Sequence, residues 1–282
     1  DGWLVTGGLG GLGLLFAEQA ARLGTAAGQP PRLLLLSRSG RPGPGQALAR
    51  LLAAVLQLCG ERAELLRGDV AEIGEELRPR AEGLGIAHAA GVLSTRELAK
   101  LDQAELAAAL RPKAWGLWRL ARYFPDAPRL VSFNSVSALL GLGHRGGAYA
   151  AANGYADGLI SFLAGGGAGA AGASARFGAV QWGGVAEVGM ATQLTAPRAQ
   201  DPWIPLRPAQ VRELLRTLLA TPRAPARLPA PLAVAWSEEA LAMVQATVDA
   251  ALVRGLDLRT AAATRASAPG AAPRLGAAAA GE

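Results

Sequence analysis

Residues 3–13 read Trp3-Leu4-Val5-Thr6-Gly7-Gly8-Leu9-Gly10-Gly11-Leu12-Gly13. A short apolar run leads here into five glycines within seven positions, and a helical pattern follows. Glycines allow a tight strand-to-helix turn, and they let a pyrophosphate approach the backbone N–H groups at the helix N-terminus. We therefore predict that the segment from Thr6 to Gly13 binds a dinucleotide. The alternative is a plain glycine-rich turn.

Outward from this loop, short apolar runs of strand length alternate with longer Ala/Leu-rich runs of helical period. The expected strands cover residues 3–5, 32–36, 63–66, 86–89, 129–134, 174–181 and 232–235. The expected helices cover residues 12–23, 45–58, 103–123, 148–164 and 208–219. This alternation predicts an α/β fold, a doubly wound Rossmann-like seven-stranded parallel sheet with helices on both faces. Its ligand site should lie at the carboxyl ends of the strands.

The predicted domain covers residues 1–260. Residues 261–282 are mostly alanine without apolar periodicity, which is typical of a flexible linker leading out of a domain. Because the first core strand begins almost at residue 1, we expect a piece of a longer polypeptide. No signal-peptide pattern precedes that strand, and every apolar run is shorter than the roughly 18 residues of a membrane span. We therefore expect a cytoplasmic protein without a membrane partner.

Composition excludes several classes of protein. The chain has 282 residues, of which 51% are hydrophobic and 18% are charged, which indicates a globular body rather than a disordered chain. Its formal net charge is +6, but the basic residues are scattered, so we expect no nucleic-acid partner. One cysteine, Cys59, together with His88 and His144 offers neither a disulfide nor a metal cluster.

The end of the second predicted strand bears on the choice of dinucleotide. It reads Leu35-Leu36-Ser37-Arg38-Ser39, and no Asp or Glu occurs between positions 32 and 44. NAD-selective sites place a carboxylate here for the ribose 2′-hydroxyl, whereas a guanidinium and hydroxyls pair with a 2′-phosphate. We therefore predict NADPH, bound by Ser37, Arg38 and Ser39. The alternative for Arg38 is a solvated surface arginine.

Two further strand ends supply candidate cofactor residues. At the third, the Asp69 carboxylate and the Val70 amide could hold the adenine, although Asp69 is equally well explained as a helix N-cap. The fourth ends in His88-Ala89-Ala90-Gly91, whose small residues leave room for the ribose and the nicotinamide. His88 itself is better explained as a packed, hydrogen-bonded side chain than as a catalyst.

A candidate proton donor follows from the chemistry of such a cofactor. Hydride delivery to a ketone creates an alkoxide, which needs a proton donor whose pKa is lowered by its surroundings. A tyrosine beside an ammonium can serve. Tyr149 opens the small-residue helix Tyr149-Ala150-Ala151-Ala152-Asn153, which places Asn153 one turn along on the same face. Tyr123 and Tyr155 have no such setting.

Taken together, these motifs resemble a known family. The stretches that carry the resemblance are Thr-Gly-Gly-Leu-Gly-Gly-Leu-Gly, Leu-Leu-Ser-Arg-Ser-Gly, His-Ala-Ala-Gly-Val, Leu-Arg-Pro-Lys-Ala-Trp-Gly, Tyr-Ala-Ala-Ala-Asn and Gln-Trp-Gly-Gly. Their combination is similar to the catalytic subdomain of ketoreductases from modular polyketide or fatty acid synthases, a branch of the short-chain dehydrogenase/reductases. The resemblance covers about residues 2 to 240.

The resemblance implies a role for each matching residue. Tyr149 would donate the proton, Lys113 would depress its pKa and help relay protons, and Asn153 would hold that network. Ser135 would bind the substrate carbonyl, but it lies one position further from Tyr149 than in the family pattern, so Ser137 remains an alternative. Trp182 and Gly183 would lie near the nicotinamide amide, and residues 187–210 would form a lid.

The resemblance also implies a substrate and partners. The expected reaction is NADPH-dependent reduction of a β-ketoacyl thioester on the phosphopantetheine arm of an acyl carrier protein. An upstream structural subdomain and other synthase domains would be further partners. Two alternatives remain: a stand-alone alcohol dehydrogenase acting on a free ketone, and a synthase domain that binds the cofactor without reducing anything.

Overall fold

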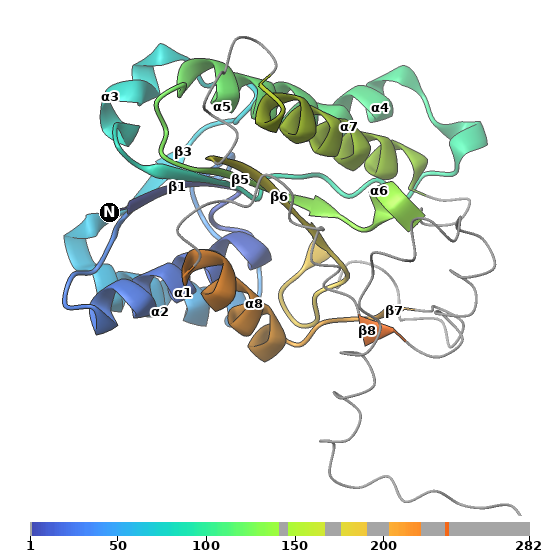
Figure 1. Ribbon diagram of the computed structural model, residues 1–282. Helices are drawn as coiled ribbons and strands as arrows, with labels where there is room; N and C mark the ends of the chain where they lie inside the picture. The colour runs from blue at the N-terminus through green and yellow to red at the C-terminus, as the bar shows by residue number, and fades with distance from the viewer. Residues whose placement is uncertain (1, 141–145, 167–175, 191–202, 221–234, 237–282) are drawn as a thin grey trace, which may run out of the picture. The chain divides into compact units, whose positions relative to one another are not determined.

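A computed structural model describes residues 2–140, 146–166, 176–190, 203–220 and 235–236. They form a six-stranded sheet between two layers of helices (Figure 1). Its strands are β1 (Gly2–Thr6), β2 (Arg32–Ser37), β3 (Ala63–Arg67), β4 (Gly85–His88), β5 (Leu130–Ser135) and β6 (Phe177–Trp182). Their order is β3-β2-β1-β4-β5-β6, and every neighbouring pair is parallel. The strand order reverses between β1 and β4, which confirms the doubly wound fold.

The strand predicted over residues 232–235 is not part of the main sheet among the residues that the structure describes. Of residues 232–235, only Ala235 belongs to the part of the chain that the structure describes. It lies in β8 (Ala235–Trp236), which pairs with β7 (Trp203–Ile204) in a separate two-stranded sheet. The main sheet therefore has six strands over the described residues.

Two hydrophobic cores lie on the two faces of the sheet because side chains alternate along each strand. In β2, Leu33 and Leu35 face one core, whereas Leu34 and Leu36 face the other. The first core is covered by α1 (Gly11–Ala26), α2 (Gln46–Cys59) and α8 (Pro208–Ala220). The second is covered by α5 (Leu117–Tyr123) and α7 (Gly147–Ala164), with α4 (Gln103–Leu110) beside α7. Both faces are thus buried, as a parallel sheet requires.

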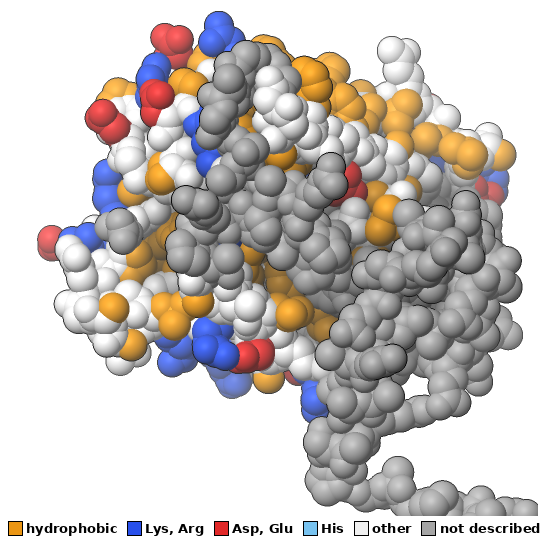
Figure 2. All heavy atoms as spheres, viewed as in Figure 1, with side chains coloured by type: hydrophobic (Ala, Val, Ile, Leu, Met, Phe, Trp, Pro, Cys, Tyr) orange, Lys and Arg blue, Asp and Glu red, His pale blue; other side chains and the backbone are white. Residues whose placement is uncertain are grey.

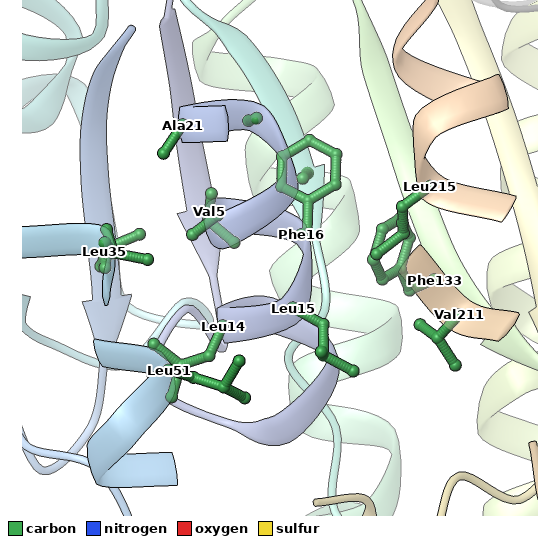
Figure 3. Close-up of a cluster of buried hydrophobic side chains, with 14 of the residues drawn as sticks. Val5, Leu14, Leu15, Phe16, Ala21, Leu35, Leu51, Phe133, Val211 and Leu215 are labelled. Atoms are coloured by element: carbon green, nitrogen blue, oxygen red, sulfur yellow. The ribbon is translucent and has the colours of Figure 1, made fainter. Parts of the chain in front are cut away.

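Phe16 of α1 anchors the first core (Figure 3). It is fully buried, and its ring meets Trp3 and Phe133 edge to face at centroid distances of 4.9 and 5.7 Å. Phe133 in turn contacts the ring of Trp182 at 5.5 Å. These ring contacts pack α1 against β1, β5 and β6.

The predicted helix over 103–123 is interrupted. α4 ends at Leu110, the π-helical turn η4 (Arg111–Gly116) follows, and α5 begins at Leu117. Pro112 lies inside this run, and a proline within a helix removes an amide donor and crowds the carbonyl four residues earlier. The wider turn accommodates the proline, and such turns occur often at functional sites. Lys113 lies on it.

Short elements complete the described structure. They are α3 (Arg78–Ala81), α6 (Ser137–Leu140), η1 (Gly60–Arg62), η2 (Glu75–Leu77) and η3 (Leu98–Lys100). The first compact unit spans Asp1–Ala235 and the second Trp236–Glu282. The predicted domain end at 260 and the linker 261–282 fall outside the described residues. None of the helices described is long and apolar enough to cross a bilayer.

Candidate active site

A cavity of about 660 Å³ opens at the carboxyl ends of β1 to β4. Loops that are distant in the sequence meet there, because the carboxyl ends of parallel strands share one edge of the sheet. The predicted cofactor residues that line it are Gly7, Leu9, Gly10, Ser37, Arg38, Ser39, Asp69, Val70, Ala90 and Gly91.

The glycine loop is shaped by close backbone contacts. Gly7 has φ +66°, and a Cβ on it would lie 2.6 Å from the Ala90 nitrogen. A Cβ on Gly13 would overlap the Gly7 carbonyl, and one on Gly11 would overlap the Val188 carbonyl. No side chain caps the first turn of α1. Its N–H groups therefore face the loop without a side-chain acceptor, as a bound pyrophosphate requires.

The remaining predicted cofactor residues do not line this cavity; they are Thr6, Gly8, Gly11, Leu12, Gly13, His88, Ala89, Trp182 and Gly183. Thr6 and His88 are fully buried and hydrogen-bond each other, with 2.7 Å between Oγ1 and Nδ1. Burial, and then the charge of Lys113, hold the pKa of His88 well below its usual value. His88 is therefore a packed, uncharged side chain. Trp182 is 3% exposed and packs into the core.

Arg38 is exposed at the edge of the cavity. Among the described residues, no carboxylate forms an ion pair with it, so its guanidinium is available to a ligand. Its serine neighbours shape the loop: the Ser37 hydroxyl accepts a hydrogen bond from the Gly40 amide (3.1 Å), and the Ser39 hydroxyl donates one to the Arg41 carbonyl (2.6 Å). Arg41, which the sequence motifs did not single out, also lines the cavity.

Asp69 is not a helix N-cap, because the next helical turn begins only at Glu75. Its Oδ1 accepts a hydrogen bond from the Ala71 amide (2.9 Å), and its Oδ2 lies 3.1 Å from Nε of Arg111. Burial raises the pKa of Asp69, but these two donors outweigh it, so the net pKa lies below its usual value. Asp69 is thus an ionised turn residue that fixes the loop after β3.

Ser135 and Asn153 converge on the side chain of Tyr149. Burial raises the pKa of Tyr149, while hydrogen bonding from Ser135 and Asn153 lowers it. Ser135 is the last residue of β5, and its Oγ accepts the Ser137 amide at 3.2 Å, which leaves its hydroxyl proton free to be donated. Ser137 is 1% exposed. The geometry therefore favours Ser135 over Ser137 despite its longer spacing.

Asn153 and Lys113 are both buried. Asn153 donates from Nδ2 to the Tyr149 carbonyl at 2.8 Å. The Nζ of Lys113 donates to the Phe133 carbonyl, and burial lowers the pKa of Lys113 to about 7. Lys113 is not among the groups that shift the pKa of Tyr149 in this structure. Lys113, with a pKa of about 7, is neutral at the pH where the phenol of Tyr149 ionises, so its expected role toward Tyr149 stays a prediction.

The cavity and the Lys113 cluster are adjacent. Gly91 lines the cavity, and a Cβ on it would lie 3.3 Å from Cε of Lys113 and 3.6 Å from Cε of Met190. Met190 belongs to the predicted lid over 187–210, of which residues 191–202 are not described. The lid remains a prediction.

Sequence reasoning missed three polar residues behind Tyr149. Asp157 of α7 accepts hydrogen bonds from Asn134 of β5 and Gln181 of β6. The signal was present, since Asp157 follows Tyr149 and Asn153 at intervals of four residues. Among the residues described, no group of three or more His, Cys, Asp or Glu could hold a metal ion.

Known proteins share this sequence and fold. A family model described as "KR domain" matches residues 2–182. The chain is 33% identical over 199 residues to a phenolphthiocerol/phthiocerol polyketide synthase of Mycobacterium tuberculosis, and the match covers 67% of this chain. It covers only 8% of that synthase.

Solved structures of ketoreductases are similar as well, including these two. Structures of A-type ketoreductases from a modular polyketide synthase give a TM-score of 0.58 and 30% identity, over 76% of this chain and 45% of that chain. The ketoreductase from the first module of phoslactomycin biosynthesis in Streptomyces sp. HK803 gives 0.59 and 29%, over 75% and 48%. The chain thus spans less than half of each. With a family model that matches more than half of its length and relatives of this kind, the chain belongs to the KR domain family, the ketoreductases of polyketide synthases.

Proposed function

We propose that this domain reduces a β-ketoacyl thioester, carried on the phosphopantetheine arm of an acyl carrier protein, to the β-hydroxyacyl thioester, with NADPH as its cofactor. The observation that carries the proposal is the convergence of Ser135 and Asn153 on Tyr149, beside a cavity with a glycine loop on one wall. This arrangement would supply a proton donor and a carbonyl-binding hydroxyl close to a cavity whose lining residues suit a dinucleotide.

The described residues fit NADPH rather than NADH. The uncapped first turn of α1, with Gly7 and Gly10, would hold the pyrophosphate. The exposed Arg38 would pair with the 2′-phosphate. Ala90 and Gly91 leave space on the side toward Lys113, where the nicotinamide would lie.

NADPH bound in this cavity would supply a hydride to the β-carbonyl carbon. The hydroxyl of Ser135 would donate a hydrogen bond to the carbonyl oxygen, which takes up the π electron pair as the carbon is reduced. Tyr149 would then give its phenolic proton to that oxygen and form the alcohol. Lys113 and Asn153 would help return a proton to the phenolate. The product gains one hydride and one proton in total.

The test is a reductase assay with matched substrates. The protein is given NADPH and either a β-ketoacyl thioester on an acyl carrier protein or the corresponding free ketone, and loss of NADPH and formation of alcohol are measured. We expect faster reduction of the carrier-bound thioester, and NADH should support little activity. Preference for the free ketone would favour a stand-alone dehydrogenase. Binding of NADPH without turnover would indicate a silent domain.

An apolar surface supports the proposed upstream subdomain as a partner. Trp115 of η4, Trp118 of α5, and Tyr155 and Phe162 of α7 are 59%, 49%, 43% and 57% exposed. Figure 2 shows hydrophobic side chains gathered over α7. Exposed aromatic residues at this density are typical of a protein–protein contact. We infer that an α/β subdomain preceding this one in the chain covers them.

Extending the chain upstream tests this partner. An addition of about 150–200 residues, a domain length, should raise Tm and reduce aggregation. Replacing Trp118 and Phe162 by serine should remove most of that gain in Tm while leaving NADPH binding unchanged. An extended chain with the Tm of the short one would contradict the proposed contact.

A further inference from the structure

α7 carries a third polar side chain on the face that presents Tyr149. Tyr149, Asn153 and Asp157 follow one another at intervals of four, which places them along one side of the helix. Asp157 is half-buried and reaches toward the sheet. Its Oδ1 accepts a hydrogen bond from Nδ2 of Asn134 (2.6 Å), and its Oδ2 accepts one from Nε2 of Gln181 (2.7 Å).

The two donors are themselves held in place. Asn134 and Gln181 are register partners on the neighbouring strands β5 and β6. The Oδ1 of Asn134 accepts a hydrogen bond from the Ser132 hydroxyl at 2.6 Å, which turns its NH₂ group toward Asp157. A carboxylate that accepts one hydrogen bond on each oxygen from two such amides has little freedom to turn. Asp157 is therefore a fixed negative charge at the surface of the sheet.

Strand β5 connects this charge to Lys113. Its consecutive residues Phe133, Asn134 and Ser135 bind the Lys113 ammonium, bind Asp157 and contact Tyr149, respectively. Burial lowers the pKa of Lys113 to about 7, and the charge of Asp157 opposes that shift. Burial raises the pKa of Asp157, while Asn134, Gln181 and Lys113 lower it. The two groups thus stabilise each other's charged form.

Other titratable groups around Lys113 do not supply this charge. On β4, His88 is buried and uncharged. On α7, Tyr149 keeps its proton at neutral pH because burial raises its pKa. On the helical run that holds Lys113, Glu105 pairs with Arg96, and Arg111 pairs with Asp69 and Glu72. Asp157 is thus the carboxylate left to act on Lys113 among the residues described.

We propose that Asp157 is a positioning residue of the reductase, whose carboxylate, fixed by Asn134 and Gln181, keeps Lys113 charged beside Tyr149. The use of that charge in the reduction rests on the proposed function. The electrostatic coupling between Asp157 and Lys113 does not, and it can be measured without turnover.

The composition of the chain makes that measurement direct. Its only lysines are Lys100 and Lys113, so isotope-labelled lysine gives two Cε signals in an NMR titration. Lys100 is an exposed internal reference that pairs with Glu97. In the Asp157→Asn variant we expect the midpoint of Lys113 to fall by about one unit, while that of Lys100 stays constant. Asp126→Asn, which removes an exposed carboxylate paired with Arg78, is the matched control and should change neither midpoint.

A charge-relocating variant separates electrostatics from structure. Asp157→Asn combined with Gln181→Glu moves the carboxylate from α7 to β6 and can keep an amide–carboxylate hydrogen bond. We expect this pair to restore at least half of the lost shift. If Asp157→Asn alone folds poorly, the Lys113 midpoint can still be measured in this double variant. A Lys113 midpoint in folded Asp157→Asn equal to that in Asp126→Asn would overturn the proposal. A Lys113 midpoint in the folded pair that lies more than about half a unit below that in Asp126→Asn would overturn it as well.

The pH profile of turnover supplies the second readout. Above the midpoint, a fall of about one unit should lower the protonated fraction, and with it kcat, by up to about tenfold, with little change in KM. A shifted Lys113 midpoint with an unshifted kcat profile would overturn the positioning role and leave the reductase assignment intact. If the unmodified protein reduces no thioester, the proposed function fails, and the NMR titration still decides the coupling.

Discussion

The cavity beneath the glycine loop and the cluster around Lys113 lie side by side but use polar groups in opposite ways. At the cavity, Arg38 is exposed, and the loop after β1 offers backbone N–H groups. In the cluster, Lys113 is 3% exposed and Asn153 fully buried. A solvated guanidinium binds an anion with little change in its own ionisation, whereas a buried ammonium has its pKa set by its neighbours. Under the proposed function, binding of the dinucleotide and transfer of the proton would therefore use two neighbouring sets of residues with opposite exposure to solvent.

The largest expected effect tests whether the two regions act independently. Tyr149→Phe removes the proton donor and leaves the cavity unchanged, so turnover should fall by at least about a hundredfold. The Kd for NADPH should change less than about threefold, because the dinucleotide contacts are elsewhere. Steady-state kinetics and fluorescence titration with NADPH measure the two quantities.

Tyr123→Phe is the matched control, since that hydroxyl lies on α5 near Arg119. It should leave both quantities unchanged. Near-full reductase activity in Tyr149→Phe would remove this phenol from the mechanism.

The second prediction concerns the pH dependence of the free energy of unfolding, which the burial of Lys113 should change. Its pKa is about 7 in the folded protein, whereas a lysine in an unfolded chain titrates near about 10.4. Between these values the unfolded chain binds more protons, so the free energy of unfolding rises with pH. From about pH 7 to about pH 9, the unmodified protein should gain about 2 kcal/mol more than Lys113→Met.

Urea unfolding at the two pH values measures this difference. Lys100→Met provides the comparison, because its side chain is 66% exposed. Equal pH dependence in the unmodified protein and Lys113→Met would mean that Lys113 titrates as it does in solvent.

A smaller effect is expected from the cavity. Arg38→Asp replaces the proposed 2′-phosphate partner with a like charge and should raise the KM for NADPH by more than about tenfold. The KM for NADH should change little, which shifts cofactor preference. Arg50→Asp on α2 makes the same charge change away from the cavity and should have no such effect. An unchanged KM for NADPH in Arg38→Asp would leave Arg38 as a surface arginine.

Local pattern was sufficient for most of the fold. The predicted helix over 148–164 corresponds to α7 at Gly147–Ala164, and the predicted strand over 32–36 to β2 at Arg32–Ser37. The spacing of apolar residues that distinguishes a helix from a strand repeats within a short stretch of chain, so a single sequence is enough to recognise it. The interruption at η4 had a signal in the sequence, Pro112, which the predicted helix over 103–123 did not take into account. The widening of the turn depends on the packing that accommodates the proline.

The residues of the candidate site also fall into those that the sequence predicts and those that depend on tertiary packing. The glycine loop and the Ser37-Arg38-Ser39 segment follow directly from the sequence, since each is contiguous and stands at a strand end. The family resemblance led us to expect Trp182 near the nicotinamide amide, and in the structure its ring packs on Phe133 in the core. Which way a side chain points from the end of a strand depends on the pleat and on what packs behind it.

The sequence by itself determined the doubly wound α/β fold, the position of the glycine loop and the candidates Tyr149, Asn153, Lys113 and Ser135. The tertiary structure alone decided that Asp157, Asn134 and Gln181 form one network and that Lys113 donates to a backbone carbonyl. The physical reason is that hydrogen-bond partners on different elements are joined by distance and burial, neither of which is encoded in spacing along the chain.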